Sequence, residues 1–107
     1  MLGPMKVGAT APAATVQVKT DDNKVYPITG ATYAGWLFLE ETQELVTLDP
    51  TRFSETDGPN GIFTYSWRAT DTAKEGFYKV LFKLTIASDV VYVEETLPIE
   101  PVFPGVS

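Results

Sequence analysis

The sequence predicts an all-β fold, namely a single antiparallel β-sandwich of seven or eight short strands. Several short stretches alternate apolar and polar residues with the period of two that is typical of half-buried strands. Clusters of Gly, Pro, Asn and Asp separate these stretches, as turns do. The chain has 107 residues, the ordinary size of one domain, and none of its stretches predicts a helix of more than about one turn.

The domain boundaries follow from the distribution of Gly and Pro near the start. Residues 1–13 hold two glycines and two prolines and few residues that could anchor them, so they predict a flexible N-terminal arm. The sandwich domain is then expected over residues 14–107. Its first strand is expected in "TVQVK", where Val16 and Val18 alternate with polar residues, and the polar "TDDNK" that follows predicts a turn.

The next strand is expected in "YAGWLFLE". Trp36 and Phe38 point to one face of this stretch and two leucines to the other. Because both faces are apolar, we expect either a central strand or a strand covered on both sides. A shorter strand follows in "ELVTLD", and "ETDGPNG" is the strongest turn signal in the chain.

The remaining strands lie in the second half of the chain. The stretch "IFTYSWR" places Phe63, Tyr65 and Trp67 on one face, and "FYKVLFKLTI" is the longest alternating stretch. After a turn at "ASD", the stretch "VVYVEETL" returns the chain. The stretch "IEPVF" predicts a last edge strand, since Pro101 is tolerated only at an edge.

The segment "ATDTAKEGFYKV" predicts a structural corner between the two sheets. Asp71 is expected to accept backbone hydrogen bonds from Ala73 or Lys74, and Gly76 permits a tight or left-handed turn. Tyr78 stands where immunoglobulin-like sandwiches carry a tyrosine whose hydroxyl bonds to backbone a few residues upstream. The alternative is that Asp71 serves as a metal ligand or general base. This alternative lacks a second acid, His or Lys that the sequence would place nearby.

Composition and charge narrow the possible functions. The formal net charge of −6 comes from fourteen acids spread along the chain, while the eight basic residues are mostly isolated, so nucleic acid is not expected as a partner. The chain has no His and no Cys, which removes most familiar catalytic and metal sites, and we expect no enzyme activity, no cofactor and no metal. No apolar run is long enough to span a bilayer and no export signal is recognisable, so no membrane partner is expected.

Residue types in the sequence suggest three other kinds of site, namely a carboxylate pair, a calcium loop and a platform for sugars. Adjacent acids, such as those in "LEET" and "VEET", point to opposite faces of a strand and cannot converge as a catalytic pair. The "TDDN" turn lacks the spaced oxygen ligands of a calcium loop. Trp36 and Trp67 would form a platform for sugar rings if both were exposed, although the alternating face of Trp67 favours the core.

An ordered set of motifs resembles the N-terminal domain of phage baseplate upper proteins and related small virion modules. The motifs span about residues 14–103 and consist of "ITGA", a "GxxxYxW" strand, a "DTAxxGxY" corner and a later Pro. The matching positions are Ile28 to Ala31, Gly61, Tyr65, Trp67, Asp71, Thr72, Ala73, Gly76, Tyr78 and Pro98.

The resemblance implies an immunoglobulin-like sandwich that serves as a non-enzymatic structural protein of a bacteriophage virion. Such a module would belong to the tail, the baseplate or the decoration of the capsid. It would be made in the host cytoplasm and would contact other virion proteins, with several copies of itself in the particle. The alternative function is a carbohydrate-binding module for host or surface glycans, which would use Trp36 and Trp67.

Overall fold

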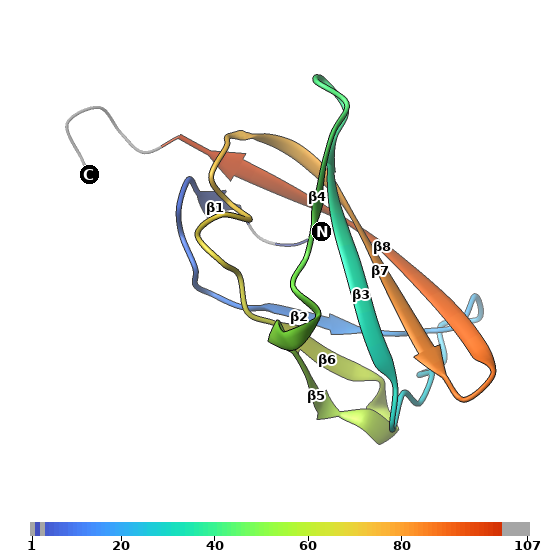
Figure 1. Cartoon of the computed structure of the whole chain (residues 1–107). Coiled ribbons are helices and arrows are strands. Elements are labelled where there is room, and N and C mark those ends of the chain that lie inside the picture. Colours follow the sequence, from blue (N-terminus) through green and yellow to red (C-terminus); the bar gives the residue numbers. More distant parts are fainter. Residues whose placement is uncertain (1, 3, 102–107) are drawn as a thin grey trace.

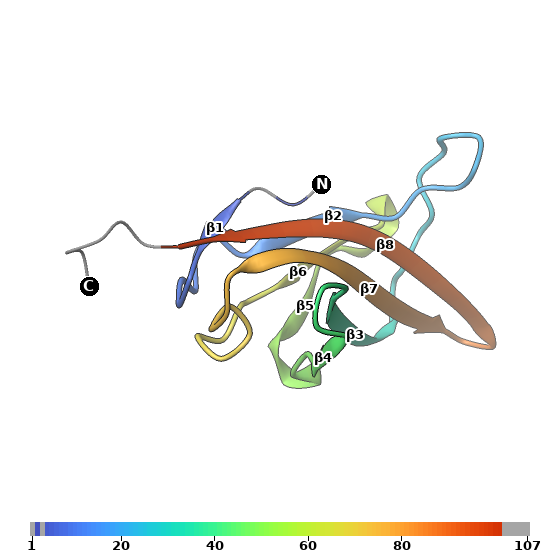
Figure 2. The ribbon, with the colours of Figure 1, turned by 90° about the horizontal axis from the view of Figure 1, so that it is seen from above.

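Two β-sheets pack face to face in the computed structural model, which describes residues 2 and 4–101 (Figures 1 and 2). The eight strands are β1 (Met5–Lys6), β2 (Ala14–Gln17), β3 (Thr32–Leu39), β4 (Glu44–Thr47), β5 (Phe53–Asp57), β6 (Ile62–Tyr65), β7 (Gly76–Ile86) and β8 (Asp89–Glu100). Two short 3-10 turns, η1 (Pro50–Arg52) and η2 (Gly58–Asn60), flank β5. The prediction of an all-β sandwich is confirmed.

The sheets differ in size and in strand direction. The larger sheet has the order β1-β8-β7-β3-β4, and the smaller has the order β2-β6-β5. All neighbouring strands are antiparallel except β1, which runs parallel to β8. The long β7–β8 hairpin and its neighbour β3 therefore form the main platform of the fold.

The core lies between the sheets and follows the alternation of the sequence. The Phe63 ring of β6 meets the Phe82 ring of β7 edge to face, with centroids 5.3 Å apart, and Phe53 lies against both Tyr65 and Phe82. Burial of such large apolar side chains supplies the main stabilisation of a domain this small. The largest fully buried side chains are those of Trp67, Tyr65, Phe63, Phe82, Ile28, Leu37, Leu39, Leu48, Leu84 and Leu97.

Strand β3 pairs on both sides, with β4 and with β7, so it is an interior strand. Only one of its faces is covered by the second sheet. Leu37 and Leu39 are buried, whereas Trp36 and Phe38 lie on the outer face and remain partly exposed. The expected alternative of coverage on both faces is therefore wrong, and the outer apolar face of β3 is surface.

The predicted separate edge strand in "IEPVF" is also wrong, because β8 continues without a break to Glu100; residues 102 and 103 lie outside the described residues. Pro98 is tolerated inside β8 for a geometric reason. The carbonyls of Thr96 and Glu100 accept hydrogen bonds from Leu2 and Val7 on the β1 side. Since alternate residues of a strand direct their backbone groups to the same side, the nitrogen of Pro98 faces away from β7 and removes no bond from the β7–β8 ladder.

The expectation of a flexible arm over residues 1–13 is corrected for its described part. Met5 pairs with Ile99 in β1 and is only 5% exposed. Farther along, the Gly8 amide donates to the carbonyl of Thr72, and the Thr72 hydroxyl donates to the carbonyl of Ala9, each at 2.8 Å. Residues 5–9 therefore pack on the sandwich, because they bury an apolar side chain and find partners for their backbone groups, whereas residues 10–13 are exposed.

Candidate functional site

The predicted corner has Tyr78 and Gly76 at the start of β7. The buried Tyr78 directs its hydroxyl to the carbonyl oxygen of Lys74, four residues upstream, at 2.9 Å. Burial, and secondarily the charge of Glu44, raises the pKa of this phenol above its ordinary value. Gly76 has φ +150°, and a Cβ atom there would lie 2.6 Å from a methyl group of the buried Leu39. The corner is therefore closed by packing and by one hydrogen bond.

Asp71 lies in the same crossover but has partners other than those expected. Its carboxylate accepts hydrogen bonds from the Tyr65 hydroxyl at 2.7 Å and from the Arg68 amide at 2.9 Å. The Arg68 guanidinium adds two more, from Nη2 at 2.6 Å and from Nε at 3.1 Å. The predicted bonds from Ala73 or Lys74 are thus wrong, because the turn from Arg68 to Asp71 directs the carboxylate back into the core.

This partly buried network joins the crossover and the end of β6, in the smaller sheet, to β4 in the larger sheet. Nη2 of Arg68 also donates to the Thr47 carbonyl of β4 at 2.8 Å, and the Tyr65 hydroxyl accepts from the Asp49 amide at 3.1 Å. Burial, and next the bond to Asp71, raises the pKa of Tyr65 to about 12. Because four donors already occupy the Asp71 carboxylate, the geometry favours a structural role over proton transfer.

The two tryptophans of the predicted sugar platform lie on different sides of the larger sheet. Trp67 is 1% exposed in the core and lies edge to face on Tyr65, with ring centroids 5.1 Å apart. Trp36 lies on the outer face. The structure therefore does not bring this pair together. Within residues 2 and 4–101, no group of three or more acidic side chains gathers in a way that could hold a metal ion.

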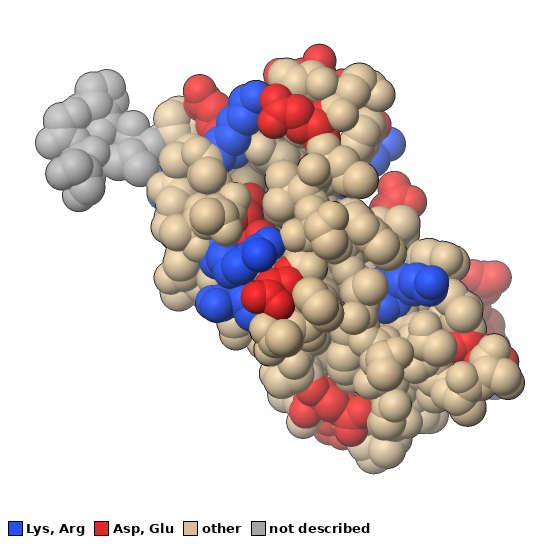
Figure 3. All heavy atoms as spheres, in the orientation of Figure 1, with Lys and Arg blue, Asp and Glu red and all other residues tan. Residues whose placement is uncertain are grey.

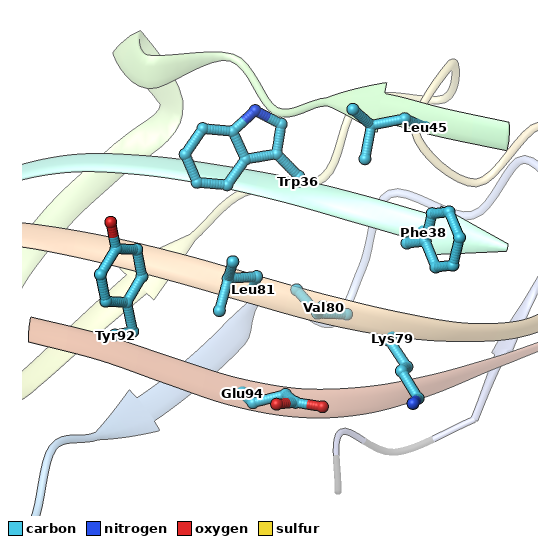
Figure 4. Close-up of a pocket in the computed structure, with 8 residues that line it drawn as sticks. All are labelled: Trp36, Phe38, Leu45, Lys79, Val80, Leu81, Tyr92 and Glu94. Carbon is cyan, nitrogen blue, oxygen red and sulfur yellow. The ribbon is translucent and has the colours of Figure 1, made fainter. Parts of the chain in front are cut away.

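A second candidate site is a hollow of about 520 Å³ on the outer face of the larger sheet, which we call the outer groove (Figure 4). Cross-strand pairing builds it, since Trp36 of β3 stands beside Leu81 of β7, and Phe38 stands beside Leu45 of β4. Its lining residues are Trp36, Phe38, Leu45, Lys79, Val80, Leu81, Tyr92 and Glu94.

The groove exposes large apolar side chains to solvent. Leu45 is 62% exposed and Tyr92 is 59% exposed, and Figure 4 shows the Trp36 and Tyr92 rings with Leu81 near them. Charged groups stand at its margin, where the Lys79 ammonium lies 2.7 Å from the Glu40 carboxylate. Contiguous apolar surface with a polar rim is typical of interaction sites rather than of ordinary solvent-facing surface.

The sequence contained a partial signal for the groove. The apolar outer positions of "YAGWLFLE" indicated it, but that pattern was equally compatible with coverage by another element. Leu81 stands between Lys79 and Lys83 on its face of β7, and only the β3–β7 and β7–β8 registers bring Leu81 and Tyr92 to the same face as Trp36. On the face of the molecule seen in Figure 3, some acidic and basic side chains lie side by side, and one acidic group at the lower end has no basic neighbour.

Comparison with known proteins gives no family for this chain. No protein-family model matches it, and no curated protein matches it. In the part of the chain that the structure describes, no helix has the length and apolar character needed to cross a membrane.

Proposed function

We propose that the chain is a non-enzymatic structural module of a bacteriophage virion and that it contacts neighbouring proteins through the outer groove. The proposed contact surface rests on the apolar lining of the groove, where Leu45 and Leu81 are exposed and Trp36 is partly exposed beside them. Burial of these side chains against a protein neighbour would remove apolar area from water at a site that already has the shape and rim of an interface.

The virion assignment is supported by the motif resemblance and by the use the fold makes of the motif residues. Tyr65, Asp71 and Tyr78 all take part in the closure of the crossover. Gly61 has φ +71° and follows η2, and a Cβ atom there would lie 2.4 Å from the Tyr26 carbonyl oxygen. These residues stabilise the fold, which is consistent with a structural role for the protein in a particle.

The proposal places the protein in the particle, in the tail, the baseplate or the decoration of the head. It would be made in the host cytoplasm and would contact other virion proteins and further copies of itself. The proposed role is non-enzymatic, since the most buried acid, Asp71, has its oxygen atoms occupied by protein donors.

A glycan-binding function is the second candidate, and one observation favours it. Trp36 and Tyr92 present rings on the same outer face, with Leu81 near both (Figure 4). Aromatic faces of this kind stack on the C–H faces of sugars. Tyr92 thus takes the place in this platform that was predicted for Trp67.

The test is the composition of purified particles that carry variants of the gene. We expect peptides of the unmodified chain to sediment with particles, and Leu45→Lys to abolish this incorporation because it charges the groove. Phe77→Lys is the matched control, since Phe77 is an exposed apolar residue of the same sheet that does not line the groove. Absence of the unmodified chain from particles would contradict the proposal. Glycan-array binding that Trp36→Ala abolishes without unfolding would favour the second candidate.

A further inference from the structure

Within residues 2 and 4–101, the outer edge of β8 is the longest strand edge of the larger sheet that has no paired strand along most of its length (Figure 1). Strand β1 pairs with its end at Ile99 and Glu100, and the Leu2 amide donates to the Thr96 carbonyl farther back along the same edge. We propose that the remaining part of this edge pairs in antiparallel fashion with the same edge of a second copy of the chain. This inference concerns self-association in solution and does not depend on the virion assignment or on the occupant of the outer groove.

The direction of the backbone groups along β8 can be determined from two hydrogen bonds. The Thr96 carbonyl accepts from the Leu2 amide, and the Glu100 carbonyl accepts from the Val7 amide, each at 2.9 Å. Both carbonyls therefore face away from β7. Because every second residue of a strand faces the same side, Val90, Tyr92 and Glu94 direct their N–H and C=O groups to the open edge.

The side chains along this edge suit strand addition. Residues 90–93 read "VVYV", a run of β-branched and aromatic residues without Pro, Lys or Gly. Natural proteins protect exposed edges with Lys, Pro, bulges or very short strands, and this run carries none of those devices. Val90 and Tyr92 are about half exposed or more, at 49% and 59%. An edge of this composition is a template for pairing with another strand.

The charges near the edge select one register for a symmetric pair. The two-fold axis must pass midway between the two copies of one residue, because only then do the paired side chains lie on the same face of the sheet. We name each register by that residue. With the axis at Val91, Val90 pairs with Tyr92 of the second copy, and Asp89 and Glu94 stand opposite uncharged residues. Aromatic and β-branched side chains that face each other across strands are a favourable pair.

Neighbouring registers are less favourable. An axis at Val90 pairs Tyr92 with Ser88, which precedes β8, so fewer residues of the two strands pair. An axis at Tyr92 places Asp89 opposite Glu95 of the second copy, which sets two carboxylates against each other. An axis one residue farther on places Val90 opposite Thr96, whose carbonyl already accepts from Leu2. The axis at Val91 therefore gives the pairing with the best match of charge and free backbone groups, and it joins the two outer faces into one surface.

The first test is the molar mass of the full chain by light scattering over a range of concentrations. We expect a dimer of the 11.7 kDa chain. Val90→Pro removes the outward N–H of Val90 while sparing the β7–β8 ladder, as Pro98 does, and should weaken the dimer by at least about tenfold. Val90→Thr is the matched control because it keeps the N–H and the β-branched shape, and it should dimerise normally. A monomer at every concentration, or a dimer that Val90→Pro leaves unchanged, would overturn the proposal.

The second test uses the absence of cysteine from the natural sequence. At an axis through Val91, the two Val91 Cα atoms would lie about 4.5 Å apart as a non-hydrogen-bonded pair. Val91→Cys should therefore form a reducible dimer in air, because this spacing fits a disulfide. Val93→Cys should not, since its two copies would stand well beyond about 7 Å apart. Cross-linking of Val93→Cys in preference to Val91→Cys would overturn the register, and this readout holds even if Val90→Pro fails to fold.

Discussion

The Tyr65 hydroxyl and the Asp71 carboxylate lie 2.7 Å apart in the interior of the sandwich, and Arg68 closes the network from the side of β4. Asp71→Ala would leave the phenol without its acceptor and the guanidinium with the Thr47 carbonyl alone among the acceptors named above. We expect a loss of about 2–3 kcal/mol in the free energy of unfolding, since removal of one partner leaves the other polar groups buried or misplaced. Urea denaturation measures this, with Asp21→Ala as a control at an exposed acid; equal effects of the two changes would contradict the role of the network.

The pKa of Tyr65 predicts a loss of stability at high pH. The phenol titrates near 10.0 when unfolded and at about 12 when folded, so the unfolded chain loses its proton first. The contribution of Tyr65 is therefore fully present below about pH 10 and is lost as the pH rises through about 12. Thermal unfolding between these values should show a steeper decline for the natural chain than for Tyr65→Phe, and identical slopes would contradict the prediction.

Tyr78→Phe should lower the free energy of unfolding by about 1 kcal/mol, because it removes the hydroxyl that donates to the Lys74 carbonyl. Chemical denaturation monitored by tryptophan fluorescence gives this value. Tyr92→Phe is the matched control, since the Tyr92 ring is largely exposed on the outer face. A neutral effect at Tyr78 would show that the corner is held by packing alone.

Gly76→Ala should destabilise the fold more than Gly30→Ala. Both glycines have positive φ. A Cβ atom at Gly76 would contact the buried Leu39 side chain, whereas a Cβ atom at Gly30 would have no other heavy atom within 4 Å. We expect Gly76→Ala to cost about 1–3 kcal/mol more than Gly30→Ala, because Leu39 must repack around the added methyl group. The midpoints of thermal unfolding compare the two, and similar midpoints would show that Leu39 moves aside freely.

Met5→Ala tests whether the N-terminal segment belongs to the folded domain. Met5 is buried beside Ile99, so the truncation should cost about 2–3 kcal/mol. Pro4→Ala, at an exposed neighbouring position, should have little effect. If the segment behaved as the flexible arm of the sequence analysis, both changes would leave the unfolding free energy unaltered, as equilibrium denaturation would reveal.

The strands with a clear period of two could be predicted from the sequence because one of their faces is buried. In β7 the buried side chains of Tyr78, Val80, Phe82 and Leu84 alternate with more exposed ones, so a local pattern encodes the fold directly. The turn at Asn23 could also be predicted from local sequence, because Asn tolerates the left-handed conformation that this residue adopts, with φ 66°.

The elements that escaped prediction depend on distant partners. Strand β5 is mostly polar and shows no alternation, and it is a strand because it pairs with β6. Strand β1 has two residues and exists through its pairing with Ile99 and Glu100. For Asp71 the residue type correctly suggested hydrogen bonds to nearby groups, but the choice of Tyr65 and Arg68 follows from the packing of the crossover against the core.

The pairing of β3 with β7 has a consequence for the order in which the molecule assembles. The ladder joins Thr32 to Thr85 and Leu39 to Tyr78, so it must close long loops before its contacts stabilise it. The β7–β8 hairpin, by contrast, needs only the short turn after Ile86. Folding of this chain is therefore expected to take on the order of milliseconds to seconds. If the β7–β8 hairpin forms first, it would expose both of its edges until β3 pairs with β7, and newly made chains would then be most vulnerable to wrong association.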